Sequence, residues 1–132
     1  MKLTRPEARI YARGMFKEAL RELVEKTDGG QASLLMDSSG IALESYSREG
    51  VQVDIDTVGV EFSVVIGAIK RASEMLEAGE AREMVVSTEK MVTLIRMVND
   101  SYFLALTMAP DGNFGKGRYL MRTTVPKLAA EL

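Results

Sequence analysis

The segment 56–76 carries apolar residues at helical spacing around more of its circumference than a helix on one sheet requires. One stripe recurs every three or four positions and comprises Val58, Phe62, Val65, Ile69, Ala72 and Leu76. Further apolar residues lie off that stripe: Val60, Val64, Ile66 and Ala68. A helix that packs on a sheet needs one apolar face, so the excess predicts contact with another molecule. The alternative is a helix sandwiched within its own domain, for which so short a chain has little covering material.

The N-terminal part predicts a helix followed by a hairpin. Apolar residues at helical spacing indicate a helix that is capped at Thr4 and runs to about Lys26; they are Ile10, Phe16, Leu20, Leu23 and Val24. Residues 28–30 read Asp-Gly-Gly and are expected to end this helix. Residues 31–37 and 41–46 are expected to form two strands joined by a tight turn.

The C-terminal half predicts three strands and a last helix. The strands are expected at 83–87, 91–97 and 102–108, and the continuous apolarity of the third favours a central position in the sheet. The last helix is expected at about 118–131, where Pro126 should kink or restart it.

The predicted order of elements is helix, two strands, helix, three strands, helix in a single domain, 1–132. The fold class is therefore α+β, with one five-stranded antiparallel sheet, the two terminal helices on one face and the middle helix on the other. If the short strand 83–87 lies at the sheet edge, pairing with the same strand of a second copy would satisfy its free backbone groups. That two-fold arrangement would also place the middle helix against its symmetry mate.

Composition narrows the possible chemistry. The chain has no cysteine and no histidine, which removes disulfides, thiol nucleophiles, the usual zinc ligands and the commonest general base. Its net charge of −2 argues against nucleic-acid binding. The longest apolar run is too short to span a bilayer, so a cytoplasmic location is expected.

Two local patterns resemble chemical sites. Residues 114–118, Phe-Gly-Lys-Gly-Arg, lack the spacing of a phosphate-binding loop; we interpret them as a flexible entry to the last helix, although Lys116 and Arg118 could bind an acidic partner. Asp54 and Asp56 could suggest a metal or acid–base pair, but helix capping is the favoured interpretation. Gly79 is expected to stop the middle helix.

Two short motifs carry a family resemblance. Residues 34–42 read Leu-Leu-Met-Asp-Ser-Ser-Gly-Ile-Ala, similar to a hydrophobic D-x-x-G hairpin, and Asn113-Phe114-Gly115 leads to Arg118 as in N-x-G-x-x-R. With its order of elements, the chain resembles the Roadblock / dynein light-chain family from about Phe16 to Leu132. The resemblance implies a homodimer with a continuous sheet through 83–87 and paired middle helices.

The resemblance also implies a function. Roadblock proteins serve as non-enzymatic platforms for Ras-like GTPases, and this chain is similar to the bacterial Mgl-type proteins of cell polarity and gliding motility. Expected partners are therefore a second copy, an MglB-type paralogue, an MglA-type GTPase and a response-regulator-like polarity protein, at the cell poles. No cofactor, metal or catalytic residue is expected.

The leading hypothesis is a homodimeric adaptor in a small-GTPase polarity module. The expected dimer interface comprises Val58, Phe62, Val65, Ile66, Ile69, Met84, Val85 and Val86. The expected partner-binding residues are Glu61, Lys70, Arg71 and Glu74.

Two other functions stay open. A direct GTPase-activating protein could supply an arginine to the nucleotide site, and Arg48, Arg71 and Arg82 are the candidates. A small-ligand-sensing domain is the third hypothesis, which the lack of a convergent polar cluster disfavours.

Overall fold

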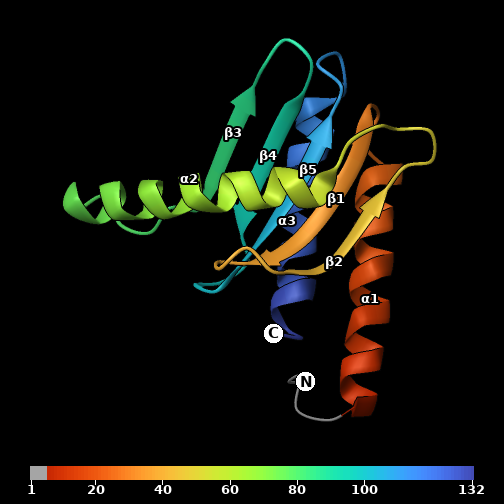
Figure 1. Cartoon of the computed structure of the whole chain (residues 1–132), viewed down its shortest axis with the longest axis horizontal. Coiled ribbons are helices and arrows are strands. Elements are labelled where there is room, and N and C mark those ends of the chain that lie inside the picture. The colour runs from red at the N-terminus through yellow and green to blue at the C-terminus, as the bar shows by residue number, and fades with distance from the viewer. Residues whose placement is uncertain (1–5) are drawn as a thin grey trace.

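The computed structural model describes residues 6–132, so the expected cap Thr4 lies outside the described residues. The predicted order of elements is confirmed (Figure 1). The elements are α1 (Pro6–Glu25), β1 (Gly30–Asp37), β2 (Ala42–Ser47), α2 (Ile55–Met75), β3 (Glu83–Ser87), β4 (Val92–Met97), β5 (Tyr102–Met108) and α3 (Phe114–Ala129).

The five strands form one antiparallel sheet in the order β2-β1-β5-β4-β3. The apolar strand β5 is therefore central, as its sequence predicts, and six of its seven residues are buried. The strands β2 and β3 form the two edges. The 83–87 strand thus has the edge position that the pairing hypothesis requires.

Helices cover both faces of the sheet. In Figure 1, α2 lies across the front, and α1 and α3 lie behind. Since successive strand residues point to opposite faces, neighbours such as Leu34 and Leu35 enter different cores. Leu35 packs with Phe16 and Leu20 of α1, whereas Leu34 packs with Ile66 of α2. The expected two-sided arrangement is confirmed.

The start of α3 differs from the prediction. The helix begins at Phe114, because the Asn113 side chain accepts a hydrogen bond from the amide of Lys116 at 3.0 Å. The glycine-rich segment is the first turn of the helix and not a flexible entry. A Cβ atom on Gly117 would lie 3.3 Å from Leu106, so this glycine allows α3 to approach the sheet closely. The helix continues through Pro126 to Ala129 without restarting.

The end of α2 also differs from the prediction. The residue that closes the helix is Glu77, with a left-handed φ of 53°, and not Gly79. The amides of Glu77 and Ala78 bond to the carbonyls of Glu74 and Ser73, which is the Schellman pattern of a helix C-terminus. Glu77 therefore forms the helix-ending turn that the sequence predicts at Gly79.

The two sheet edges differ in how their outer backbone is occupied. The amide of Arg48 bonds to β1; because pairing alternates in an antiparallel ladder, the carbonyls of Leu43 and Ser45 face away from β1. Arg13 and Lys17 of α1 donate to these carbonyls at 3.1 and 2.6 Å. Among the described residues no side chain bonds to the outer backbone of β3, so this edge is free.

Candidate interaction surface

The first half of α2 is anchored to the sheet. Asp54 accepts hydrogen bonds from the Thr57 amide at 3.2 Å and the Thr57 hydroxyl at 2.8 Å, and both bonds lower the pKa of Asp54. A Cβ atom on Gly59 would lie only 2.2 Å from the Leu34 side chain and 2.7 Å from that of Met36. Gly59 therefore lets α2 cross β1 in close contact, and Asp54 acts as the predicted cap.

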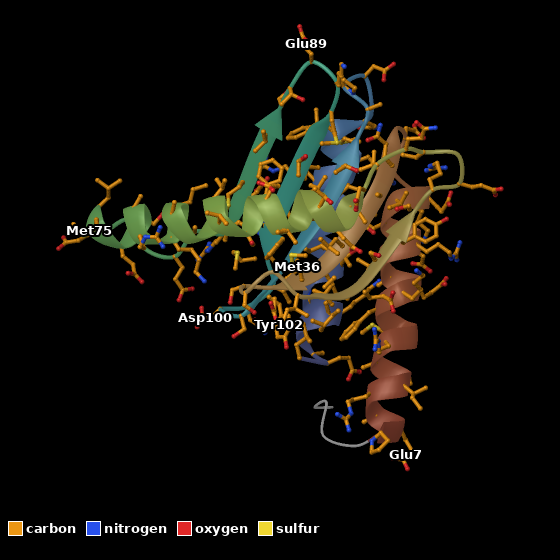
Figure 2. The ribbon with its side chains drawn as sticks, viewed as in Figure 1. Glu7, Met36, Met75, Glu89, Asp100 and Tyr102 are labelled. Carbon is orange, nitrogen blue, oxygen red and sulfur yellow. The ribbon has the colours of Figure 1, made fainter. Side chains whose placement is uncertain are left out.

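The second half of α2 extends beyond the sheet. Figure 1 shows it projecting past β3, and Figure 2 shows Met75 near its tip, clear of every strand. No α2 residue after Ile66 is buried. The side chains of Met75 and Leu76 are 85% and 77% exposed. This half thus presents apolar surface that nothing in the described chain covers.

One flank of α2 is apolar along its length except at Glu61, which lies between Val58 and Val65. At about 100° per residue, the positions Val58, Val65, Ala72 and Leu76 fall on one side of the helix. The opposite flank carries Asp56, Ser63, Lys70 and Glu74. We call Val58, Val65, Ala72 and Leu76 the apolar flank. It is a surface on which the apolar flank of a second copy of α2 can pack.

The residues predicted for a dimer interface fall into three groups. Ile66 and Met84 are buried in this chain's own core, beside Ile95 and Phe103, so they lie out of reach of a second copy. Three others are half-buried and pack against that core: Val58, Phe62 and Ile69. The accessible remainder is Val65, Val85 and the half-buried Val86. Helical periodicity could not separate these groups, because α2 is apolar on several sides.

The free edge of β3 is held in place from inside the chain. Met97 donates its amide to the carbonyl of Arg82, and the alternation of the ladder therefore turns the backbone groups of Val85 outward. Glu83 accepts from Arg96 at 3.1 Å and from Arg118 at 2.6 Å. Hydrogen bonding to Glu83 raises the pKa of Arg118, so this arginine is engaged within the chain.

The four residues predicted to bind partners do not form one site. Lys70 and Glu74 line a groove of about 690 Å³ beneath the end of α2, where Met97 and Asp100 also lie. The Lys70 ammonium donates to the carbonyl of Asp100 at 3.1 Å. Glu61 and Arg71 are exposed on α2 and do not line this groove.

The three arginines considered for GTPase activation differ in whether they are hydrogen-bonded within the chain. The guanidinium of Arg48 donates to the carbonyls of Gly30 and Val24 at 2.9 and 2.8 Å, and to Glu25 at 2.9 Å. It closes the junction between α1 and β1, a structural role that no sequence spacing indicated. Arg71 and Arg82 are exposed and make no side-chain hydrogen bond or ion pair among residues 6–132.

A family model, the Roadblock/LC7 domain, matches residues 16–107. The chain belongs to the Roadblock/LC7 family. Roadblock proteins of the MglB and MglC kind are generally non-catalytic regulators. Comparison with curated proteins gave no significant match.

Solved Roadblock structures resemble the chain over most of its length. MglC from Myxococcus xanthus is 36% identical, with 89% of this chain and 98% of that chain covered and a TM-score of 0.65. The gliding protein MglB from Thermus thermophilus is 20% identical, with 90% and 89% covered and a TM-score of 0.82. An MglB in a tetrameric arrangement is also 20% identical, with 90% and 88% covered and a TM-score of 0.82. The MglB likeness supports the fold, whereas the MglC identity extends to the sequence.

The described residues offer little for metal or membrane chemistry. Within 6–132 there is no group of three Asp or Glu side chains placed to hold a metal ion. In that same part of the chain, every helix is too short or too polar to cross a bilayer. The exposed apolar surface of α2 is therefore the principal feature that calls for a functional explanation.

Proposed function

We propose that this protein is a homodimeric, non-enzymatic adaptor in a Ras-like small-GTPase polarity module, acting in the cytoplasm at the cell poles. The observation that carries the proposal is the projection of an apolar helix past a free sheet edge. An edge strand without partners is a template for another strand. Two copies related by a two-fold axis would pair β3 with β3 and continue the sheet.

The projecting half of α2 would then have a place to pack. It extends past β3 on the same face of the sheet as the first half, so in the two-fold dimer it would lie over the partner copy's sheet. The apolar flank would meet the same flank of the partner helix. The relatives support an assembly of this kind, since one MglB structure is a tetrameric arrangement.

The partners we propose beyond the second copy are proteins of the Mgl system. The 36% identity with MglC over most of the chain favours an adaptor that reaches an MglA-type GTPase through an MglB-type paralogue. A response-regulator-like polarity protein is a further proposed partner. Glu61 and Arg71 are suited to these contacts, because both are exposed on α2; Arg71 lies off the apolar flank, whereas Glu61 borders it. The dimer as proposed needs no cofactor.

Proline at Val85 tests the strand pairing. The Val85 amide faces outward, so Val85→Pro removes a donor from the free edge without breaking the β3–β4 ladder. We expect sedimentation equilibrium to give twice 14.5 kDa for the native chain and 14.5 kDa for the variant. Val85→Thr is the matched control, because it retains the amide and the branched shape. A native chain that sediments as a monomer, or a folded proline variant that remains dimeric, would overturn the pairing.

The helix contact is tested on neighbouring residues of α2. Val65 is on the apolar flank and 43% exposed, whereas Val64 is 74% exposed and points away from the sheet. We expect Val65→Glu to dissociate the dimer, since it places a charge in the helix contact, and Val64→Glu to leave the dimer intact. Equal effects of the two substitutions would contradict the flank assignment. Phe62 is a poorer probe, because it also packs against the protomer's core.

A GTPase-activating function is the second candidate. It is favoured by Arg71 and Arg82, which are exposed and make no ion pair within residues 6–132. An arginine supplied in trans accelerates hydrolysis by about 10³–10⁵. We expect excess protein to leave the hydrolysis rate of an MglA-type GTPase unchanged. Acceleration that disappears in Arg71→Ala or Arg82→Ala would replace the adaptor proposal with activation.

A further inference from the structure

Positive charge is concentrated where α3 lies against β3. Glu83 of β3 accepts a hydrogen bond from Nη1 of Arg96 at 3.1 Å, and from Nε and Nη2 of Arg118 at 2.6 and 3.0 Å. Arg122 follows Arg118 by one turn of α3, so the two side chains are neighbours on the same side of the helix. The sequence of α3 contains no acidic residue. These contacts therefore combine three guanidinium groups with a single carboxylate.

The carboxylate of this cluster is enclosed, whereas two of the arginines remain accessible. The side chain of Glu83 is 19% exposed and that of Arg118 is 52% exposed. Arg118 uses Nε and Nη2 for Glu83, which leaves its Nη1 without a hydrogen bond among residues 6–132. Arg122 is exposed and makes no side-chain hydrogen bond or ion pair in the same part of the chain. Both arginines thus retain donors that can bind a further carboxylate.

An aromatic side chain extends the two arginines into a row along α3. Phe114 precedes Arg118 by four residues and is exposed. We call Phe114, Arg118 and Arg122 the α3 ridge. Its members are about 6 Å apart, as for any residues one helical turn apart. Alternate residues of an extended chain are separated by about 6.6 Å, so acidic residues at alternate positions match the spacing of the two arginines.

We infer that the α3 ridge binds an extended acidic segment of a partner protein. Two carboxylates of the segment would lie on Arg118 and Arg122, and an apolar residue beside them would pack on Phe114. The whole chain carries a net charge of −2, so the attraction of an acidic segment has to come from this local surface and not from net charge. Charge complementarity of this kind steers association and fixes orientation.

This site is separate from the surface proposed for self-association. In Figure 1, α3 lies on the face of the sheet opposite α2. The ridge consists of α3 side chains, whereas the proposed strand pairing uses the outward backbone of β3. The inference does not depend on the dimer, since it can hold for a monomeric chain and fail for a dimeric one.

A synthetic probe peptide tests the inference. The probe is a fluorescent peptide of about 10 residues, with glutamates at alternate positions and one leucine; the control peptide has lysine in place of each glutamate. We expect the native chain to bind the probe at least about tenfold more tightly than the control, by anisotropy at low salt. The net charge of the chain would favour the lysine peptide instead. Equal binding, or tighter binding of the lysine peptide, would overturn the inference.

Matched charge reversals on one helix locate the contact. Arg122 and Lys127 are both exposed on α3, but they are separated by about 140° around the helix. We expect Arg122→Glu to weaken probe binding by about tenfold or more, because it reverses one end of the ridge. Lys127→Glu makes the same change in net charge, and we expect less than about twofold weakening. Equal weakening by the two variants would show a non-specific charge effect and overturn the inference.

Removing the chain's own carboxylate should have the opposite effect. Glu83 competes with the partner's carboxylates for Arg118, so we expect Glu83→Gln to tighten probe binding by about fivefold or more. Glu89→Gln at the β3–β4 turn (Figure 2) makes the same change in net charge, and we expect less than about twofold tightening. Equal tightening by both variants, or weaker binding by Glu83→Gln, would overturn the inference.

The arginine Nε–H resonances in NMR spectra report the contact directly. We expect the probe to shift the signals of Arg118 and Arg122 and to leave that of Arg48, whose Nε donates to the carbonyl of Gly30. A shift at Arg48 without one at Arg118 or Arg122 would overturn the inference. Vesicles with anionic phospholipid are the final comparison. Capture by vesicles that depends on Arg122, without probe binding, would assign the ridge to a membrane surface and also overturn it.

Discussion

The helices α1 and α2 are nearly equal in length but differ in how they use apolar residues. Among the 20 residues of α1, five are buried, and they follow a single stripe from Ala12 to Val24. Only three of the 21 residues of α2 are buried, although α2 has the more apolar sequence. Ile10 and Tyr11 of α1 are exposed, at 74% and 57%, but from Ala12 onward the apolar sequence of α1 is explained by the protomer's own core. That of α2 is not, because much of its apolar surface remains exposed.

The largest expected contrast between these helices is in stability. Phe16 is fully buried, so Phe16→Ala should lower the free energy of unfolding by about 3–5 kcal/mol. Val64→Ala should change it by no more than about 0.5 kcal/mol, since Val64 is exposed. Urea unfolding at several protein concentrations separates folding from association. A comparable loss for both variants at the lowest concentration would contradict the contrast.

Two glycines of α2 extend the comparison within one helix. Gly59→Val should destabilise the protein by about 1–3 kcal/mol, because the new side chain would overlap the buried Leu34. At Gly67 a Cβ atom would meet only the Arg71 side chain, at 3.5 Å. Gly67→Val should therefore be close to neutral, within about 0.5 kcal/mol. Similar unfolding midpoints for the two variants would show that the crossing over β1 is not tight.

The start of α3 gives a smaller effect. Asn113→Ala removes the hydrogen bond to the Lys116 amide, and we expect a loss of about 1 kcal/mol in the free energy of unfolding. Asp111→Ala in the same loop is the control, because Asp111 makes no side-chain hydrogen bond among the described residues. Thermal unfolding of both variants gives the measurement. If Asn113→Ala leaves the free energy of unfolding unchanged, the result would favour the interpretation of residues 114–118 as a flexible entry to the helix.

The smallest expected effect distinguishes the caps of α2 and α3 by pH. The pKa of Asp54 is lowered by the Thr57 hydroxyl and amide. Its contribution to stability is therefore present above the unfolded pKa of about 3.9 and is lost as the pH falls through the lower folded value. The Thr57 amide NMR signal should move over that range, whereas the Lys116 amide beside Asn113 should not. Asp54→Asn should abolish the movement, and its persistence would exclude Asp54 as the source.

Much of the fold could be predicted from the sequence because its patterns are local. Alternation and turn residues located the strands, and the uninterrupted apolarity of β5 identified the central strand. The start of α3 was misplaced, since the close contact of Gly117 with Leu106 depends on a distant part of the chain. The burial of Ile66 and Met84 in the protomer's own core could not be predicted from the sequence either. Which side of an all-round apolar helix faces its own sheet is decided only by packing.

The occupied edge of β2 has a consequence for how far an assembly can grow. A subunit with two adhesive edges behaves like a bifunctional monomer in polymer chemistry, and such monomers form chains of indefinite length. Arg13 and Lys17 bind outward carbonyls of β2, which leaves β3 as the single reactive end. If β3 pairs with β3 as proposed, two subunits consume both reactive ends and growth terminates. Two side chains of α1 would thereby protect the protein against fibre formation.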